Sequence, residues 1–133
     1  MNQFVSVPGI NAAIPTALDP AAPPANADGD RVHAVIKGTA INHGGKTNGY
    51  MVPNPVAQGA LVVDALRRAG VDPATVGYLE AHGTGTELGD PVEIAGLSRA
   101  FDLPPGSCAI GSVKSNIGHP EAAAGIAALT KVI

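Results

Sequence analysis

Aromatic residues are scarce in this sequence and tryptophan is absent, so large rings cannot dominate the core. Phe, Tyr and Trp make up 3% of the 133 residues, whereas all hydrophobic types together reach 45%. The core must therefore be built from Ala, Val, Ile and Leu. A chain of this length is enough for one domain with a modest core.

Cysteine, basic charge and long apolar runs are also scarce, and each shortage excludes a class of protein. A single cysteine cannot form an internal disulfide, which favours a reducing cytoplasm. The formal net charge of -3 lacks the basic excess of nucleic-acid-binding domains. No segment approaches the roughly 18 consecutive apolar residues of a membrane span, and the start lacks a signal-peptide pattern. We therefore expect a cytoplasmic protein that binds neither nucleic acid nor a membrane.

Proline divides the chain into two parts. Five of the twelve prolines fall within residues 1–26, among alanines and few charges, which predicts an irregular N-terminal segment. From residue 27 onward, runs rich in β-branched residues alternate with runs of helical spacing. Strands are expected at 31–41, 76–81 and 107–113, and helices at about 56–69, 90–101 and 120–133. Such alternation favours an α/β fold, in which helices cover a sheet.

Several residues mark where the predicted helices begin and end. Pro55 suits a first helical position, and Gly70 suits the residue after a last turn. Asp90 is expected to cap the following helix. Pro91 would then occupy its first position and Glu93 its third, a capping box in which Asp replaces Ser or Thr.

Two histidines are the first candidates for chemistry. His82 and His119 each follow a predicted strand and precede a predicted helix, so both are expected at the same edge of the sheet. A nearby helix N-terminus disfavours imidazolium, and a neutral ring can donate an N–H to a developing oxyanion. The spacing alone leaves open a second interpretation, in which both are structural histidines in turns.

Lys114 and Cys108 are the other candidates. Lys114 lies five residues before His119, in a predicted loop at 114–119. There it would either orient a substrate or be a solvated surface lysine. Cys108 lies in an apolar predicted strand with no helix start behind it, so we expect a buried structural cysteine rather than a nucleophile.

The glycines after the second predicted strand suggest two competing sites. The run GTGTELG resembles a dinucleotide-binding turn, but its G-x-G-x-x-x-G spacing is one residue longer than that pattern. Nucleotide binding at Gly83–Gly89 is therefore the weaker hypothesis. His82, Asp90 and His119 are conceivable zinc ligands, but their spacing matches no common zinc pattern, and we expect no metal site.

Two long motifs carry a family resemblance. The segments YLEAHGTGTELGDPVE and AIGSVKSNIGHPEAAAGIAAL, in this order, resemble the C-terminal half of a β-ketoacyl synthase. More narrowly, they resemble the ketosynthase domain of a modular polyketide synthase. The segment ADGDRVHAVIKGTAINHGGKTNGYMVPNP extends the resemblance, which covers residues 27–133. It implies the C-terminal half of a thiolase-like α-β-α-β-α fold, incomplete as an isolated chain, whereas residues 1–26 match the family poorly.

The resemblance also implies an activity and a set of roles. The family joins acyl and malonyl-type thioesters by decarboxylative Claisen condensation, with the acyl group held on an active-site cysteine. By motif, His82 and His119 would stabilise the thioester oxygen and assist decarboxylation, and Lys114 would support them electrostatically. Thr84 and Thr86 match threonines that hydrogen-bond the phosphopantetheine arm.

The resemblance implies partners and points to a missing group. No cofactor is expected to bind directly, since the extender unit arrives on the phosphopantetheine arm of an acyl carrier protein, and the parent family is homodimeric. The family's nucleophilic cysteine belongs to an N-terminal motif that this sequence lacks. We therefore expect the acid–base part of the site, completed by a missing N-terminal ketosynthase half, and an inactive isolated chain. A non-catalytic remnant or interaction module of the same fold is the alternative.

Overall fold

The structure is a computed structural model that describes residues 3–6, 29, 31, 33–47, 49 and 52–133. Its elements follow in the order β1 (Gln3–Ser6), β2 (Val35–Thr39), α1 (Pro55–Ala69), η1 (Pro73–Thr75), β3 (Tyr78–Glu80), α2 (Gly89–Ala100), β4 (Ala109–Gly111), α3 (Lys114–Ile117), η2 (Glu121–Ala123) and α4 (Ala124–Val132). The sequence pattern does not predict β1. Most of residues 1–26 lie outside the described residues, so the expected division near residue 27 stays a prediction.

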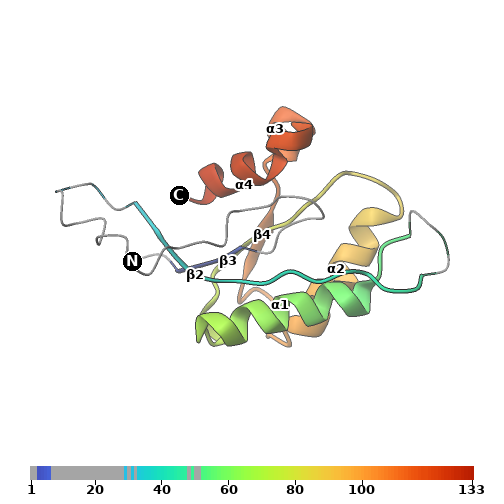
Figure 1. The fold of residues 1–133 in the computed structure, drawn as a ribbon, viewed down its shortest axis with the longest axis horizontal. Helices are drawn as coiled ribbons and strands as arrows, with labels where there is room; N and C mark the ends of the chain where they lie inside the picture. The colour runs from blue at the N-terminus through green and yellow to red at the C-terminus, as the bar shows by residue number, and fades with distance from the viewer. Residues whose placement is uncertain (1–2, 7–28, 30, 32, 48, 50–51) are drawn as a thin grey trace.

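Two pairs of parallel strands organise the described chain (Figure 1). Strand β1 pairs with β2, and β3 pairs with β4 so that Glu80, at the end of β3, lies opposite Gly111, at the end of β4. Because parallel strands end at the same edge, the loops that follow β3 and β4 leave side by side. In Figure 1, α1 and α2 lie on one side of these strands and α3 and α4 on the other, which confirms the predicted α/β class.

Helix α1 has the boundaries that the sequence predicts. Its cap is Asn54, whose side-chain oxygen accepts hydrogen bonds from the backbone N–H groups of Val56 and Ala57. Pro55 occupies the first helical position. Gly70 follows the last turn in the left-handed conformation, with φ of 61°, which suits glycine.

The core lies along one face of α1. Its buried apolar residues on this helix are Leu61, Val62, Ala65, Leu66 and Ala69. Val71 is buried against this face, and the partly buried Leu97 and Phe101 pack on it from α2 and the residue that follows it. The core is therefore mainly aliphatic, as the shortage of aromatic residues predicts.

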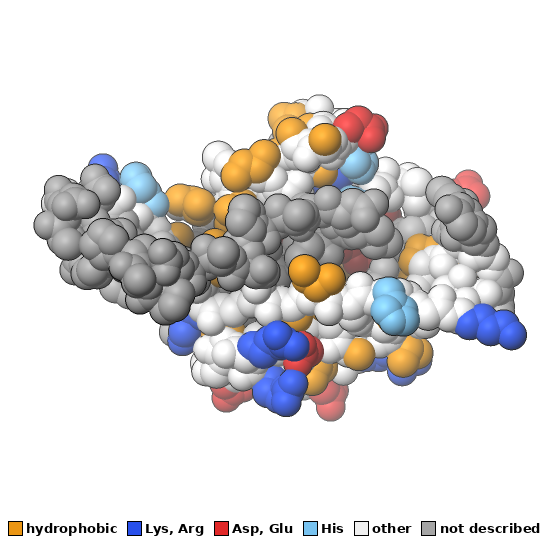
Figure 2. Space-filling model, viewed as in Figure 1, with side chains coloured by type: hydrophobic (Ala, Val, Ile, Leu, Met, Phe, Trp, Pro, Cys, Tyr) orange, Lys and Arg blue, Asp and Glu red, His pale blue; other side chains and the backbone are white. Residues whose placement is uncertain are grey.

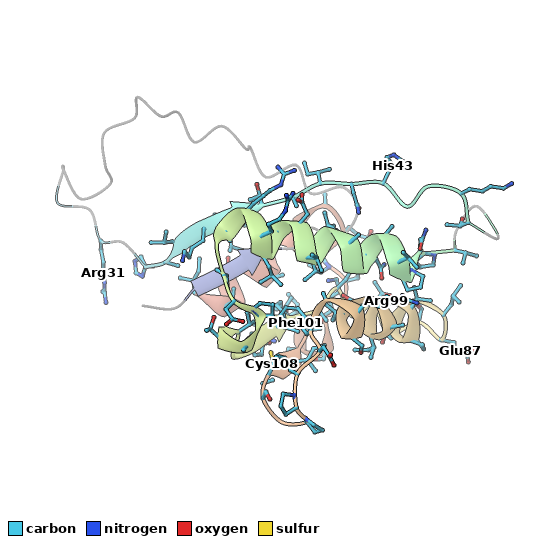
Figure 3. The ribbon with its side chains drawn as sticks, turned by 90° about the horizontal axis from the view of Figure 1, so that it is seen from below. Arg31, His43, Glu87, Arg99, Phe101 and Cys108 are labelled. Carbon is cyan, nitrogen blue, oxygen red and sulfur yellow. The ribbon has the colours of Figure 1, made fainter. Side chains whose placement is uncertain are left out.

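Helices α1 and α2 lie side by side and approach closely at two glycines (Figure 3). A Cβ atom at Gly59 would lie 2.9 Å from the carbonyl oxygen of Gly96 and 3.0 Å from Cβ of Arg99. A Cβ atom at Gly96 would lie 2.9 Å from Cβ of Gln58. The crossing thus requires hydrogen atoms in place of side chains, and it fixes α2 against the core.

The start of α2 differs from the prediction. The helix begins at Gly89, earlier than expected, and its N-cap residue, Leu88, forms no side-chain cap. Asp90 lies inside the first turn, where its carboxylate accepts a hydrogen bond from the backbone N–H of Gly85. The capping-box prediction is therefore wrong, because this carboxylate binds the loop before the helix instead of the helix's own backbone.

The segment around β4 also differs. The predicted strand at 107–113 is reduced to Ala109–Gly111, and Ile110 is 48% exposed, so the strand is not the buried one expected. The residues from Lys114 to Ile117 form helix α3 instead of a loop. The predicted helix at 120–133 is split into the turn η2 and helix α4. Because α3 begins so soon after β4, Lys114 stays near the sheet edge.

Candidate functional site

A pocket of about 310 Å³ lies where β3 and β4 end. It is lined by residues from the loop after β3, the first turn of α2 and the segment after β4: Gly83, Thr84, Gly85, Asp90, Ser112, Lys114, Ser115, Gly118 and His119. Three of the predicted site residues, Thr84, Lys114 and His119, are among them. His82 is not among the described lining residues, but it is the residue directly before Gly83, which lines the pocket.

The two candidate histidines meet beside the pocket. The ring centroids of His82 and His119 lie 5.6 Å apart, and the ring planes are nearly perpendicular, at 88°. The residues are 37 positions apart in the sequence. The parallel pairing of β3 with β4 brings them together, because each histidine follows one of these strands.

The ring of His119 is held in one orientation by its own loop. The backbone N–H of Glu121 donates a hydrogen bond of 3.0 Å to Nδ1 of His119. Glu121 adopts a left-handed conformation, with φ of 47°, which is unfavourable for a residue with a side chain. A neutral ring whose Nδ1 accepts a hydrogen bond carries its proton on Nε2. His119 is thus prepared to donate from Nε2.

The environment of His82 disfavours a charged ring. Partial burial lowers the pKa of His82 below its ordinary value of 6.5, and the nearby Lys114 ammonium lowers it further. The carboxylate of Glu93 acts in the opposite direction without reversing the shift. This direction supports the neutral state predicted from the sequence, with burial as the largest cause and the Lys114 cation as the second.

Lys114 is buried, with 8% of its surface exposed, so the solvated-lysine interpretation is wrong. It is the first residue of α3, and its backbone N–H donates to Oγ of Ser112 over 3.3 Å. The same hydroxyl donates to the carbonyl oxygen of His82 over 3.4 Å. Ser112 therefore links the lysine segment to the histidine segment.

Two carboxylates of α2 hold the loop after β3, a role that their spacing in the sequence does not indicate. Glu93 accepts hydrogen bonds from the backbone N–H groups of His82 and Gly83, at 2.6 and 2.9 Å. Asp90 accepts from Gly85 at 3.1 Å. A dinucleotide-binding loop needs such N–H groups free for phosphate, and two carboxylates there would repel it. The arrangement disfavours the nucleotide hypothesis.

The two candidate threonines divide between the pocket and the turn. Thr84 lines the pocket, whereas Thr86 is not among the described lining residues. Their hydroxyl oxygens lie 3.3 Å apart, and Oγ1 of Thr86 accepts a hydrogen bond from the backbone N–H of Gly89. Thr84 is thus available to a ligand, and Thr86 supports the turn that presents it.

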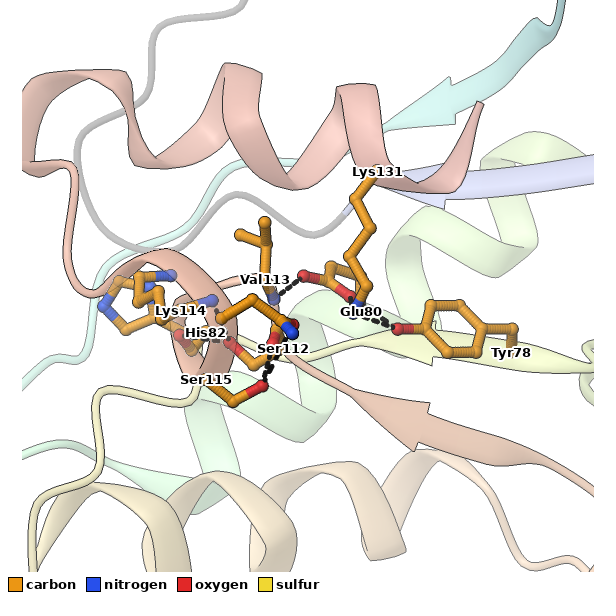
Figure 4. Close-up of polar contacts among 9 residues, drawn as sticks. Tyr78, Glu80, His82, Ser112, Val113, Lys114, Ser115 and Lys131 are labelled. Carbon is orange, nitrogen blue, oxygen red and sulfur yellow. Dashed lines mark hydrogen bonds and ion pairs between the residues drawn. The ribbon is translucent and has the colours of Figure 1, made fainter.

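A second polar cluster joins β3 to α4 and to Val113, the residue before α3 (Figure 4). The carboxylate of Glu80 accepts hydrogen bonds from the Tyr78 hydroxyl at 2.6 Å, from Nζ of Lys131 at 2.8 Å, and from the backbone N–H of Val113. Tyr78, Glu80 and Val113 lie within the two long motifs, but the sequence indicated no role for them, and Lys131 lies outside both motifs. The available signal was a charged residue at the end of a strand, two positions before His82.

Cys108, a metal site and a membrane span find little support in the residues that the structure describes. Cys108 is partly buried and lies just before β4, outside the described pocket lining, and burial raises the pKa of its thiol. Cys108 is thus less buried than the structural cysteine that the sequence predicts, although a raised pKa disfavours a thiolate, as expected for a residue that is not a nucleophile. Among the described residues, no group of three or more His, Cys, Asp or Glu side chains could hold a metal ion. No helix in the described part of the chain is long and apolar enough to cross a membrane.

Solved structures share the fold of this chain. The chain is similar over 81% of its length to the oxazolomycin ketosynthase domain OzmH KS7 of Streptomyces albus JA3453, with a TM-score of 0.76 and 66% sequence identity. It is also similar to the ketosynthase from module 6 of the bacillaene synthase of Bacillus subtilis 168, with a TM-score of 0.78 and 47% identity. It spans 19% and 20% of those two chains. The fold is therefore part of the thiolase-like fold of ketosynthases, as predicted.

Sequence comparisons give the family. Residues 33–133 match the family described as "Beta-ketoacyl synthase, C-terminal domain". Polyketide synthase ThaG of Burkholderia thailandensis is 66% identical over 111 residues, which are 80% of this chain and 2% of that protein. Polyketide synthase PksM of Bacillus subtilis is 55% identical over 133 residues, which cover 98% of this chain and 3% of that protein. The chain belongs to the β-ketoacyl synthase family, and it corresponds to the C-terminal part of a polyketide synthase ketosynthase domain.

Proposed function

We propose that this chain forms the acid–base wall of a condensation site, in which His82 and His119 donate hydrogen bonds to the thioester oxygen of an extender unit. The observation that carries the proposal is the histidine pair, with ring centroids 5.6 Å apart beside a pocket that also contains buried Lys114. Two donors this close can serve one oxyanion, which is the arrangement that acyl-transfer chemistry needs.

The proposed reaction develops negative charge at that oxygen. When a malonyl-type thioester loses carbon dioxide, the electron pair of the broken carbon–carbon bond moves toward the thioester carbonyl and forms an enolate. Donors already aimed at the oxygen stabilise this charge more than they stabilise the bound substrate. The Nε2–H of His119 and the neutral ring of His82 suit that role. The enolate carbon then attacks an acyl thioester, and a thiolate leaves.

Lys114 and Thr84 have supporting roles in this proposal. The ammonium of Lys114 keeps His82 neutral and adds positive potential beside the developing enolate. The hydroxyl of Thr84 lines the pocket and would hydrogen-bond the phosphopantetheine arm, with Thr86 supporting its turn. No cofactor would bind the chain directly, since this arm is a substrate carrier.

The proposal includes partners. An acyl carrier protein would deliver the extender unit, and the family's nucleophilic cysteine would come from the N-terminal half of a homodimeric ketosynthase. Cys108 is a poor substitute, because it lies outside the described pocket lining. We accordingly expect no acyl-enzyme from residues 1–133 alone.

A chimeric ketosynthase tests the roles of the two histidines. Residues 33–133 would replace the matching segment of the bacillaene module 6 ketosynthase, and condensation of acyl and malonyl thioesters would be followed by product mass. We expect an active chimera. Because each histidine is proposed to stabilise the enolate, His82→Ala and His119→Ala should each lower kcat by about a hundredfold or more.

Val63→Ala is the matched control, because Val63 lies on the exposed side of α1 away from the pocket. It should leave kcat unchanged. Activity that survives both histidine substitutions would contradict the assigned roles. A folded chimera without activity, beside an active parent enzyme, would favour the alternative of a non-catalytic module.

A further inference from the structure

We infer that Glu80 is a positioning residue for this site, because its buried carboxylate joins the strand that leads to His82, the residue before Lys114, and α4, the helix that follows His119. The inference deepens the proposed function and rests on it. Glu80 is not among the described residues that line the pocket, so it acts through these segments and not through contact with substrate.

The first link joins the end of β3 to the start of α3. Glu80 is the last residue of β3 and precedes His82 by two positions. Its Oε1 accepts a hydrogen bond from the backbone N–H of Val113, the residue directly before Lys114. The N-cap residue of α3, Val113, has no capping side chain, and the Glu80 carboxylate binds its backbone N–H at the start of this helix. The position of Lys114 relative to His82 therefore depends on Glu80.

The second link joins the same carboxylate to α4. Nζ of Lys131 donates to Oε2 of Glu80 over 2.8 Å and to the hydroxyl oxygen of Tyr78 over 2.7 Å, and it lies 5.4 Å from the centre of the Tyr78 ring. Lys131 belongs to the helix that follows His119 through the turn η2. Figure 4 shows the Lys131 side chain extending from α4 down to Glu80 and Tyr78. Glu80 thus also restrains the helix behind His119.

Because Glu80 is charged and buried, it must keep its hydrogen-bond partners in place. The Glu80 side chain is 8% exposed, and that of Lys131 is 32% exposed. Burial raises the pKa of Glu80, but the hydrogen bonds from Lys131, Tyr78 and Val113 outweigh it and hold the pKa below the ordinary value of 4.5. The group is therefore ionised at neutral pH. A buried carboxylate tolerates few arrangements of its partners, because an unpaired charge is costly.

A purely structural role of Glu80 would affect the measurements differently from a positioning role. If Glu80 only stabilised the fold, its removal would lower the melting temperature while the folded protein kept its kcat. A positioning role predicts that the folded protein loses kcat more than KM changes. It also predicts a change at His82, whose pKa depends on the Lys114 ammonium.

Glu80→Gln and Glu80→Ala in the chimeric ketosynthase separate these roles. Glutamine keeps an acceptor for Val113, whereas alanine removes every link. We expect kcat to fall about ten- to a hundredfold in Glu80→Ala, less in Glu80→Gln, with KM little changed, because small displacements of catalytic groups are costly. Titration of ¹³C-labelled histidine rings by NMR should show the pKa of His82 rising in Glu80→Ala, because a displaced Lys114 ammonium would repel imidazolium less.

Asp64→Asn is the matched control, because Asp64 also pairs with two basic side chains, Arg67 and Arg68, but on the surface of α1. It should change neither kcat nor the His82 titration. A folded Glu80→Ala protein with unchanged kcat and an unchanged His82 pKa would overturn the inference. If Glu80→Ala does not fold, Lys131→Met tests the link to α4 and Glu80→Gln tests the charge that holds Val113, and unchanged kcat in both variants would again overturn the inference.

The two proposals fail in distinguishable ways. Full activity in His82→Ala and His119→Ala would end the proposed function. Loss of activity in those variants, together with unchanged kcat in Glu80→Ala, would end only the positioning role.

Discussion

His82 suits an oxyanion donor because its ring is kept neutral beside a buried cation. The lowered pKa means that the folded state binds a proton at His82 more weakly than the unfolded chain does. Between the folded pKa and 6.5 the unfolded state therefore holds more protons, so stability rises with pH through this window. As pH falls through this window below about 6.5, the stability of the folded state should therefore decrease.

At the residue scale, Lys114→Met should raise the pKa of His82 toward its ordinary value, because it removes the cation that repels imidazolium. Lys114→Arg, the matched control, keeps the charge and should leave the pKa low. Histidine NMR titration of the chimeric ketosynthase measures both. The acid limb of kcat/KM should move to higher pH in Lys114→Met only, and an unchanged His82 titration would contradict the proposed coupling.

Glu93 shows why some site residues escaped prediction. In the sequence, Asp90 and Glu93 fit the spacing of a capping box. In the structure, Glu93 accepts from the backbone N–H groups of His82 and Gly83, ten or more positions away. Local spacing suggests a local partner, whereas the partner of a carboxylate depends on which backbone groups the fold brings near it.

At the element scale, the crossing of α1 and α2 holds the first turn of α2, and hence its carboxylates, beside the pocket. The helices meet through Gly59 and Gly96, which are both buried. Figure 3 shows Glu87, before α2, far from this crossing and pointing outward.

Gly59→Ala should destabilise the protein. Alanine improves helix propensity by about 1 kcal/mol, but its Cβ would lie 2.9 Å from the rigid carbonyl oxygen of Gly96. Overpacking of this kind costs about 1–3 kcal/mol, so we expect a lower melting temperature. Val63→Ala on the exposed side of the same helix is the control and should change stability little. An equal or higher melting temperature for Gly59→Ala would contradict the close crossing.

At the scale of the whole molecule, apolar side chains gather on the outer surface of α3 and α4 (Figure 2). Ile117, Ile126 and Ile133 are 60%, 63% and 55% exposed. Strands β3 and β4 form a parallel pair, and parallel sheets are normally covered on both faces and extended by further strands. Such surfaces favour association.

Residues 1–133 alone should therefore self-associate. Size-exclusion chromatography with light scattering should give a mass above that of the 13.2 kDa chain. Ile126→Lys should shift the distribution toward monomer, because it places a charge in the apolar surface. Thr130→Lys, at an exposed position of the same helix, controls for added charge. A sharp, cooperative melt of a monomer would contradict the expectation.

The sequence by itself determined the α/β class, both ends of α1 and the family, because caps, turn residues and long motifs act locally or persist as patterns. It also indicated His82, Lys114 and His119. Only the tertiary structure decided that Lys114 is buried, that Asp90 and Glu93 bind the preceding loop, and that Glu80 joins three segments. Those properties depend on parallel pairing of β3 with β4 and on helix packing, which bring together groups that local sequence patterns cannot relate.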